Sequence, residues 1–108
     1  MSVINLTEEN FTDEIERHPL MLIEFWADWC APCKAFAPIY EAAAEKHPDI
    51  QFARIDTDAE KQLASDFEIR SIPMLFTVKE GTVVAAKVGT QTPDGLEKLI
   101  RELRVHEI

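Results

Sequence analysis

The sequence predicts an α/β fold with the element order βαβαβαββα, in which helices cover both faces of a central mixed sheet. Residues 20–27 form an apolar run broken only by Glu24, as in a strand buried on both faces of a parallel sheet. Strand-like segments then alternate with segments whose apolar residues have helical spacing. Near the end, residues 74–79 and 82–88 are strand-like and flank Glu80-Gly81, which predicts an antiparallel hairpin. We expect one domain, residues 1–108.

The N-terminal part begins with a short β-prone stretch, residues 2–6, followed by a helix. Thr7 is the predicted N-cap, because Glu8 and Glu9 then lie in the first turn, where the helix dipole favours negative charge. The helix is expected to end just before Pro19, since a proline disfavours helical backbone at the preceding residue.

The middle of the chain continues the alternation of helices and strands. A helix is expected over residues 31–47, and residues 50–56 have the pattern of a second core strand. Apolar residues repeat at helical spacing over residues 59–67, and an amphipathic helix begins at Thr92-Pro93, with threonine as N-cap. The apolar strand over residues 20–27 is expected to be central in the sheet. Functional sites of α/β proteins usually lie at the C-terminal ends of such strands.

The charge of the chain excludes several kinds of partner. There are 11 Lys and Arg against 20 Asp and Glu, a net charge of −9, and no run of basic residues. Nucleic acids and anionic membrane surfaces both attract basic patches, so neither is an expected partner. The excess of acidic residues is expected to serve solubility, and the alternative is that it steers the protein toward a basic partner. We also expect the protein to be a monomer.

The N-terminus predicts the compartment. It has no basic segment followed by an apolar one, so it does not resemble a secretory signal. The longest apolar run is too short to span a bilayer. We therefore expect a cytoplasmic protein, in a reducing environment where paired cysteines are more often catalytic or metal-binding than structural.

The two cysteines of the chain lie three positions apart in Trp29-Cys30-Ala31-Pro32-Cys33-Lys34. Residues at this spacing share one helix face, so the sulfurs can bond, but such a short loop stabilises the fold little. A zinc site needs four ligands, and the three histidines are scattered without ligand spacing. We expect no metal site within one chain; zinc shared by the cysteines of two chains is the alternative.

Several spaced motifs resemble the thioredoxin family. Phe25-Trp26-Ala27 leads into the cysteine motif, Pro38 lies in the next helix, Ile72-Pro73 precedes a strand and Lys87-Val88-Gly89 lies near the end. The resemblance covers nearly the whole chain. It implies the thioredoxin fold and a thiol–disulfide oxidoreductase that reduces disulfides in other proteins.

Three residues are the candidates for catalysis. Cys30 lies at a helix N-terminus, where unpaired N–H groups and the dipole stabilise a thiolate, so it is the expected nucleophile. Cys33 should be shielded and act second, closing a redox disulfide with Cys30. Glu24 shares a strand face with Trp26, beneath the cysteines, where burial should raise its pKa and suit it to take the proton of Cys33. The alternative for Glu24 is a carboxylate that reaches solvent at the sheet edge.

The surroundings of this acid differ from the family pattern. The family acid is usually aspartate, and many members carry a buried lysine near it. Alignment on Ile55-Asp56 puts Phe52 at the lysine position, which predicts that the cation is missing there and that the pKa of the acid is higher still. Arg54, two residues further on the same face, is a possible substitute.

An apolar rim is expected around Cys30 for docking of target proteins. Its members are Trp29, Ala31, Pro32, Ile72, Pro73 and Gly89. The resemblance implies a cis peptide bond at Ile72-Pro73, with the backbone of Ile72 free to pair with an extended target segment. Met74 stands where the family commonly has threonine, and it either fills the core or contacts the target.

The resemblance also implies the partners. The expected partners are disulfide-containing target proteins and a thioredoxin reductase, which supplies electrons from NADPH, while the chain itself binds no cofactor. Two alternatives stay open. One is a related oxidoreductase with another electron donor or direction, because Glu24, Phe52, Ala31 and Met74 all lie near the cysteines. The other is a partner-binding adaptor without catalysis.

Overall fold

The computed structural model describes residues 2–107, and its elements follow the predicted order. The strands are β1 (Val3–Asn5), β2 (Leu20–Trp26), β3 (Gln51–Asp56), β4 (Met74–Lys79) and β5 (Thr82–Val88). The helices are α1 (Phe11–Arg17), α2 (Ala31–Lys46), α3 (Lys61–Asp66) and α4 (Pro93–Val105). No helix within the described residues is long and apolar enough to cross a membrane.

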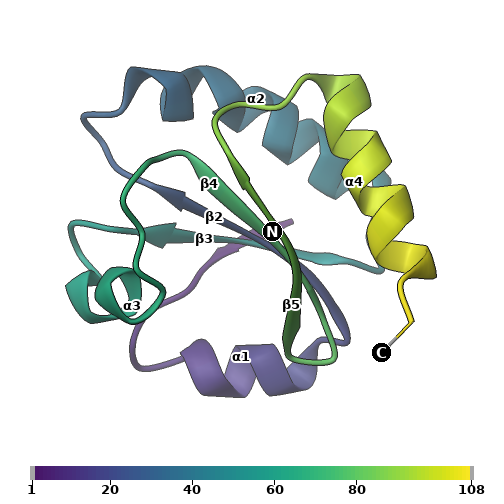
Figure 1. Cartoon of the computed structure of the whole chain (residues 1–108), viewed down its shortest axis with the longest axis horizontal. Coiled ribbons are helices and arrows are strands. Elements are labelled where there is room, and N and C mark those ends of the chain that lie inside the picture. Colours follow the sequence, from purple (N-terminus) through teal and green to yellow (C-terminus); the bar gives the residue numbers. More distant parts are fainter. Residues whose placement is uncertain (1, 108) are drawn as a thin grey trace.

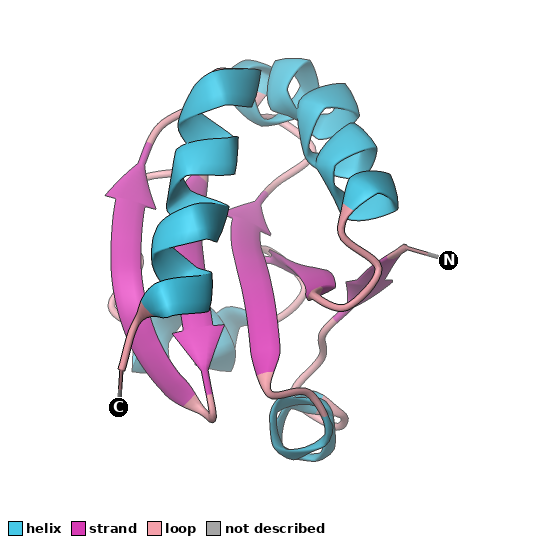
Figure 2. Ribbon diagram, turned by 90° about the vertical axis from the view of Figure 1, so that its right-hand side faces the viewer, coloured by secondary structure: helices cyan, strands magenta, loops and turns pink. Residues whose placement is uncertain are grey.

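The strands form one mixed sheet in the order β1-β3-β2-β4-β5 (Figure 1). β1 and β2 run parallel to β3, whereas β4 is antiparallel to both β2 and β5. α2 and α4 cover one face, and α1 and α3 cover the other (Figure 2). The predicted α/β class, the mixed sheet and the helices on both faces are therefore confirmed.

β2 is the central strand, and its side chains alternate between two cores. Leu22 lies in the core beneath α2 and α4, while Met21, Ile23 and Phe25 belong to the core on the α1 and α3 side. Helices therefore exclude water from both faces of β2, which is why its sequence is almost entirely apolar.

Several element boundaries differ from prediction, most of all at α1 and α3. α1 begins at Phe11 instead of just after Thr7, because Thr7 and Asn10 form a turn: the Asn10 N–H donates to Thr7 Oγ1 over 3.2 Å, and the Thr7 N–H donates to Asn10 Oδ1 over 2.7 Å. α3 is shorter than expected, since the carboxylate of Asp56 accepts from the N–H groups of Asp58 and Ala59 and holds a turn there. β1 also loses its two predicted end residues.

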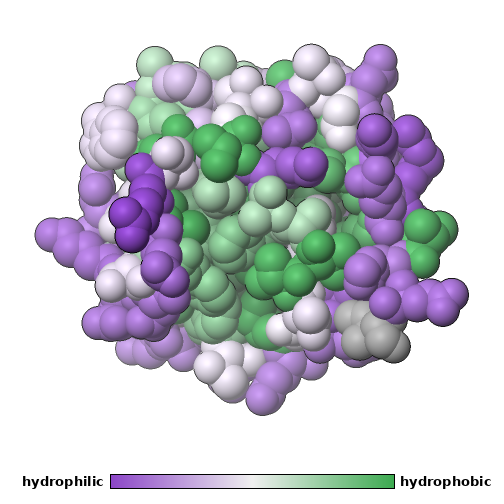
Figure 3. Space-filling model, in the orientation of Figure 1, coloured by the Kyte–Doolittle hydropathy of each residue, from purple (hydrophilic) through white to green (hydrophobic). Residues whose placement is uncertain are grey.

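The C-terminal elements match the prediction closely. Glu80 and Gly81 have φ values of 50° and 77°, the left-handed backbone of two-residue hairpin turns. Thr92 caps α4, because its Oγ1 accepts from the Gly95 N–H over 3.0 Å. β5 is an edge strand, and its Val83 and Val88 are 44% and 63% exposed. Figure 3 shows apolar surface in the middle of this face and hydrophilic surface at its margins.

Lys79, the last residue of β4, ties the sheet to the end of α4. Its Nζ donates to the backbone carbonyls of Leu103, Arg104 and His106 over 3.2, 3.0 and 2.6 Å. These carbonyls belong to the last turn of the helix and its cap, where carbonyls lack the usual helical N–H partners and the dipole favours a cation; of the three, the Leu103 carbonyl also accepts from the His106 N–H over 3.3 Å.

Replacing Lys79 by methionine should therefore destabilise the fold, because the alkyl stem is kept while three charged hydrogen bonds are lost. We expect the free energy of unfolding to fall by about 1–2 kcal/mol, measured by urea denaturation. Lys98→Met, at an exposed α4 lysine with no hydrogen bond in the described structure, is the matched control. Equal effects of the two substitutions would contradict the capping role.

Candidate functional site

Cys30 and Cys33 form a disulfide, with their Cα atoms 5.3 Å apart. The pair follows the C-terminal end of β2 and opens α2, of which Cys30 is the N-cap residue. This is the predicted place, at the end of the central strand.

The N-terminus of α2 is directed at the sulfur of Cys30. The Cys33 N–H donates to Cys30 Sγ over 3.2 Å, so an otherwise unpaired helix N–H contacts this sulfur. Both cysteines are largely shielded, at 3% exposure for Cys30 and 0% for Cys33. When the disulfide is reduced, the same N–H and the helix dipole favour the thiolate at Cys30 over one at Cys33.

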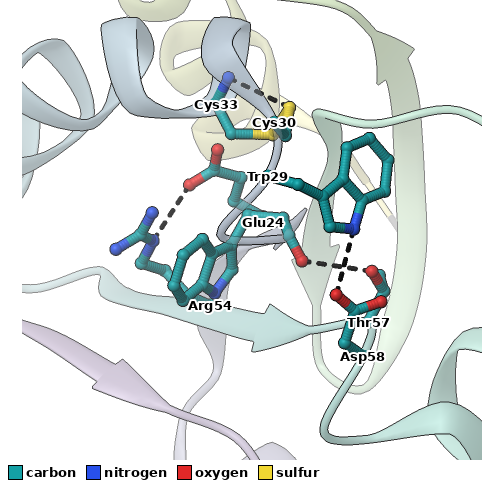
Figure 4. Close-up of a disulfide and its surroundings, with 8 residues drawn as sticks. Glu24, Trp29, Cys30, Cys33, Arg54, Thr57 and Asp58 are labelled. Carbon is teal, nitrogen blue, oxygen red and sulfur yellow. Dashed lines mark hydrogen bonds and ion pairs between the residues drawn. A yellow bond between two sulfur atoms is a disulfide. The ribbon is translucent and has the colours of Figure 1, made fainter.

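Glu24 lies beneath the disulfide and is completely buried. Its Oε1 accepts a hydrogen bond from Arg54 Nε over 3.2 Å, whereas Oε2 has no partner within the described residues. Figure 4 shows the carboxyl group between Arg54 and the cysteines, with the free oxygen on the cysteine side. The alternative of a solvated carboxylate at the sheet edge is wrong, because β2 has neighbours on both sides.

The pKa of Glu24 follows from this position. Burial raises the pKa from 4.5 to about 7, and the charge and hydrogen bond of Arg54 limit the increase. At neutral pH the carboxyl group is thus close to the point where it takes up and releases a proton with equal ease, as a general base requires.

Arg54 supplies the cation that was predicted to be missing. In the register of the parallel pair, Leu22 lies opposite Phe52 and Glu24 lies opposite Arg54. The alignment that put Phe52 beside the acid was wrong by two residues, a shift that keeps the same sheet face. Phe52 instead packs edge-on against Tyr40 in the core, with ring centroids 5.1 Å apart.

Two aromatic residues complete the surroundings of the acid. The guanidinium of Arg54 lies over the ring of Trp26, 4.2 Å from its centroid, so it is stacked as well as paired. Tyr40 donates from its hydroxyl to the Ala53 carbonyl over 2.8 Å. Burial and the charge of Glu24 raise the pKa of Tyr40, so this hydroxyl stays neutral. Tyr40 was not predicted beside the acid, since helical spacing marks it only as a core residue.

Trp29 is the large exposed member of the predicted rim, at 70%, and a hydrogen bond holds it in place. Its Nε1 donates to Asp58 Oδ2 over 3.0 Å, from the loop after β3 (Figure 4). The contact with Asp58 was not predicted either, because it joins residues 29 positions apart. Ala31 and Pro32, at the start of α2, are exposed as well.

The remaining rim residues, Ile72, Pro73 and Gly89, lie just before β4 and just after β5. Trp29 and Ile72 line a shallow hollow of about 330 Å³, together with Thr57, Ile69, Arg70 and Ser71. Pro73 is buried, its bond to Ile72 is cis as the resemblance implied, and its carbonyl accepts from the Gly89 N–H over 2.8 Å. Met74 packs against the core on the α1 side, which favours the core role over contact with a target.

The described residues contain no group of three or more Cys, His, Asp or Glu side chains placed to hold a metal ion. His18 instead contacts Glu14 over 3.1 Å, and His47 contacts Glu97 over 2.9 Å.

Comparison with known proteins agrees with this geometry. A family model described as Thioredoxin matches residues 2–102. A thioredoxin homologue of Streptomyces coelicolor is 44% identical over 95% of this chain and 77% of its own. The thioredoxins of Chlamydia trachomatis and Bacillus subtilis are 39% and 32% identical, over 88% and 94% of this chain and 92% and 98% of theirs.

A solved structure has the same fold. The structure comes from work on the structural basis of the thiol-resolving mechanism in yeast mitochondrial 1-Cys peroxiredoxin via glutathione/thioredoxin systems. It superposes on this chain with a TM-score of 0.85 at 28% sequence identity. The match covers 94% of this chain and 95% of the other.

The raised pKa of Glu24 makes the stability of the oxidised protein depend on pH. Between about 4.5 and about 7 the folded state holds the proton of Glu24 while the unfolded state has lost it, so stability falls as pH rises. Glu24→Gln does not ionise. We expect its stability relative to the parent protein to increase by roughly 3 kcal/mol between pH 4 and pH 8, measured by urea denaturation. Parallel pH profiles of the two proteins would refute the buried acid; Glu102→Gln, at an exposed α4 position, is the control.

Proposed function

Because the chain belongs to the thioredoxin family and is a thiol–disulfide oxidoreductase of the protein-disulfide reductase type, we propose that Cys30, Cys33 and Glu24 divide the reaction among them. Cys30 is the attacking thiol, Cys33 the resolving thiol and Glu24 the proton acceptor. The observation that carries the proposal is the buried carboxyl of Glu24, whose unpaired oxygen faces the cysteines (Figure 4).

The first step uses the helix N-terminus. The thiolate of Cys30 attacks one sulfur of the target disulfide, a bond forms between these two sulfurs, and the other target sulfur leaves as a thiolate. The N–H of Cys33 that contacts Cys30 Sγ at 3.2 Å supports the assignment of the nucleophile, because it stabilises negative charge on that sulfur.

The second step needs a base. Cys33 is fully buried, so its proton has no direct route to water. Glu24 Oε2 takes this proton, and the Cys33 thiolate attacks Cys30 to close the Cys30–Cys33 bond. The second target sulfur leaves, and two electrons have passed from the dithiol to the target. Arg54 holds Oε1, so the unpaired Oε2 is the proton-accepting oxygen.

Targets dock on the apolar rim in this proposal. The exposed side chains of Trp29, Ala31 and Pro32 lie on one side of the cysteines, and Ile72 lines the hollow beside Trp29. Within the described residues, the peptide N–H and carbonyl of Ile72 form no hydrogen bond. They are therefore free to pair with an extended target segment as an added strand, with Pro73 and Gly89 forming the edge of the site.

The dithiol must be regenerated after each turnover. We propose that a thioredoxin reductase does so with electrons from NADPH, that the chain itself binds no cofactor, and that it works in the cytoplasm. The support is membership of the thioredoxin family together with a reactive cysteine pair that suits a reducing compartment.

Reduction of insulin disulfides tests this function. With NADPH and a purified bacterial thioredoxin reductase, we expect continuous NADPH oxidation that depends on the chain and is lost in Cys30→Ser, because the attacking thiolate is gone. Activity with dithiothreitol but not with the reductase would point to another electron donor. Failure with both reductants would reject the reductase function and favour an adaptor.

The role of Glu24 is tested by stopped-flow kinetics of the mixed disulfide. At pH 7 we expect Glu24→Gln to slow release roughly ten- to a hundredfold and to leave formation nearly unchanged, because only release needs the proton of Cys33 removed. The parent release rate should rise with pH and level off above about 7, as Glu24 ionises, and this inflection should vanish in the variant. Cys33→Ser, which blocks release altogether, calibrates the assay. Equal slowing of both steps would contradict the proton-transfer role.

A further inference from the structure

Arg54 separates the buried acid from a hollow on the outside of the molecule. The hollow has a volume of about 490 Å³ and lies between β1 and α2, and Ser2, Val3, Asn5, Glu41, Ala42, Glu45 and Arg54 line it. None of these residues belongs to the apolar rim. Arg54 thus has one glutamate on its inner side, Glu24, and two more along the wall of the hollow; its side chain is 17% exposed.

Arg54 is held less firmly than its position suggests. Of the five N–H groups of its guanidinium, only Nε forms a hydrogen bond within the described residues, to Glu24. The stacking on Trp26 uses the face of the guanidinium, so it leaves the other four N–H groups available.

The two outer glutamates differ in their partners. The hydroxyl of Ser2 donates to Glu45, whereas Glu41 forms no hydrogen bond or salt bridge within residues 2–107. Glu41 and Glu45 lie one turn apart on α2, a spacing at which like charges repel. A cation between them relieves this repulsion, and among the described residues that line the hollow Arg54 is the cation available.

We propose that Arg54 is a positioning residue shared between Glu24 and Glu41, and that it moves outward to Glu41 when Glu24 takes up the proton of Cys33. The inference rests on the proposed function of Glu24. Protonation removes the negative charge that holds Nε, while Arg54 keeps its own charge because guanidinium does not deprotonate in proteins. The balance of attraction therefore shifts from the inner acid to the outer one.

This movement gives the proton a way out. During the second step a target protein covers the apolar rim, so water cannot approach the cysteines from that side. When Arg54 moves into the hollow, Glu24 becomes accessible from between β1 and α2, and its proton leaves to water there. The other titratable groups that face Glu24 come from α2: Cys33, which supplies the proton, and Tyr40, whose hydroxyl remains bonded to Ala53.

A double-mutant cycle tests the sharing. The pKa of Glu24 is read from its ¹³C-labelled carboxyl by NMR, in the oxidised full-length protein, for the parent, Glu41→Gln, Arg54→Met and the double variant. We expect Glu41→Gln to lower the pKa by roughly half a unit, because Arg54 then stays with Glu24, and Glu102→Gln to leave it unchanged. In the Arg54→Met background at least half of this shift should disappear. An equal shift in both backgrounds would mean that Glu41 acts directly through space, and would overturn the proposal.

Trp26 provides a readout that does not need Arg54 to be removed. In Trp29→Phe protein Trp26 is the remaining tryptophan, since the chain has two, and its emission should change at the pH where Glu24 titrates as Arg54 leaves its ring. Emission that stays constant with pH would overturn the proposal. The kinetic effect of Glu24→Gln is a separate result. If Glu24→Gln slows release of the mixed disulfide but the double-mutant cycle shows no coupling between Glu41 and Arg54, Glu24 is still the proton acceptor and the sharing of Arg54 is rejected.

Discussion

The carboxyl group of Glu24 lies in the middle of the central strand, shielded from water on both faces of the sheet and hydrogen-bonded to a single cation. Burial of an unpaired carboxylate costs several kcal/mol, and the charge of Arg54 reduces this cost when Glu24 is ionised. That partner in turn depends on the parallel register of β2 and β3, which puts Arg54 opposite Glu24. The chemistry of the site thus depends on the register of the strands beneath the cysteines.

The same strand connects the two cores with the disulfide. Its odd-numbered residues pack beneath α1 and α3, its even-numbered ones face α2 and α4, and its end passes directly into the cysteine motif. The cysteines are consequently held by an element that cannot shift without disturbing both cores. This rigidity suits a reaction in which two sulfurs must meet in line, because small displacements of reacting atoms slow a reaction strongly.

The sequence predicted most of the fold because its patterns are local. Strands β4 and β5 match to the residue, and Thr92 caps α4 as expected, since periodicity, a turn pair and a capping residue suffice to define them. The start of α1 was missed because the side chains of Thr7 and Asn10 bond to each other's backbone and stabilise a turn instead. Spacing and strand alternation predicted the positions of Cys30 and Cys33 at the end of β2 and of Glu24 beneath them, while their roles stay predictions. The partners of Glu24 and Trp29 were not placed correctly, because register and long-range contacts between loops leave no periodic signal in the sequence.

The hydrogen bond between Trp29 and Asp58 has a consequence for recognition. A large exposed indole that rotated freely would have to be immobilised each time a target docked, at a cost of about 0.5–1.5 kcal/mol per side chain. Here the loop after β3 already fixes the ring during folding. A target therefore meets a flat, preformed aromatic surface next to the reactive sulfur. In the proposed docking mode, less of the binding free energy is then spent on ordering the site.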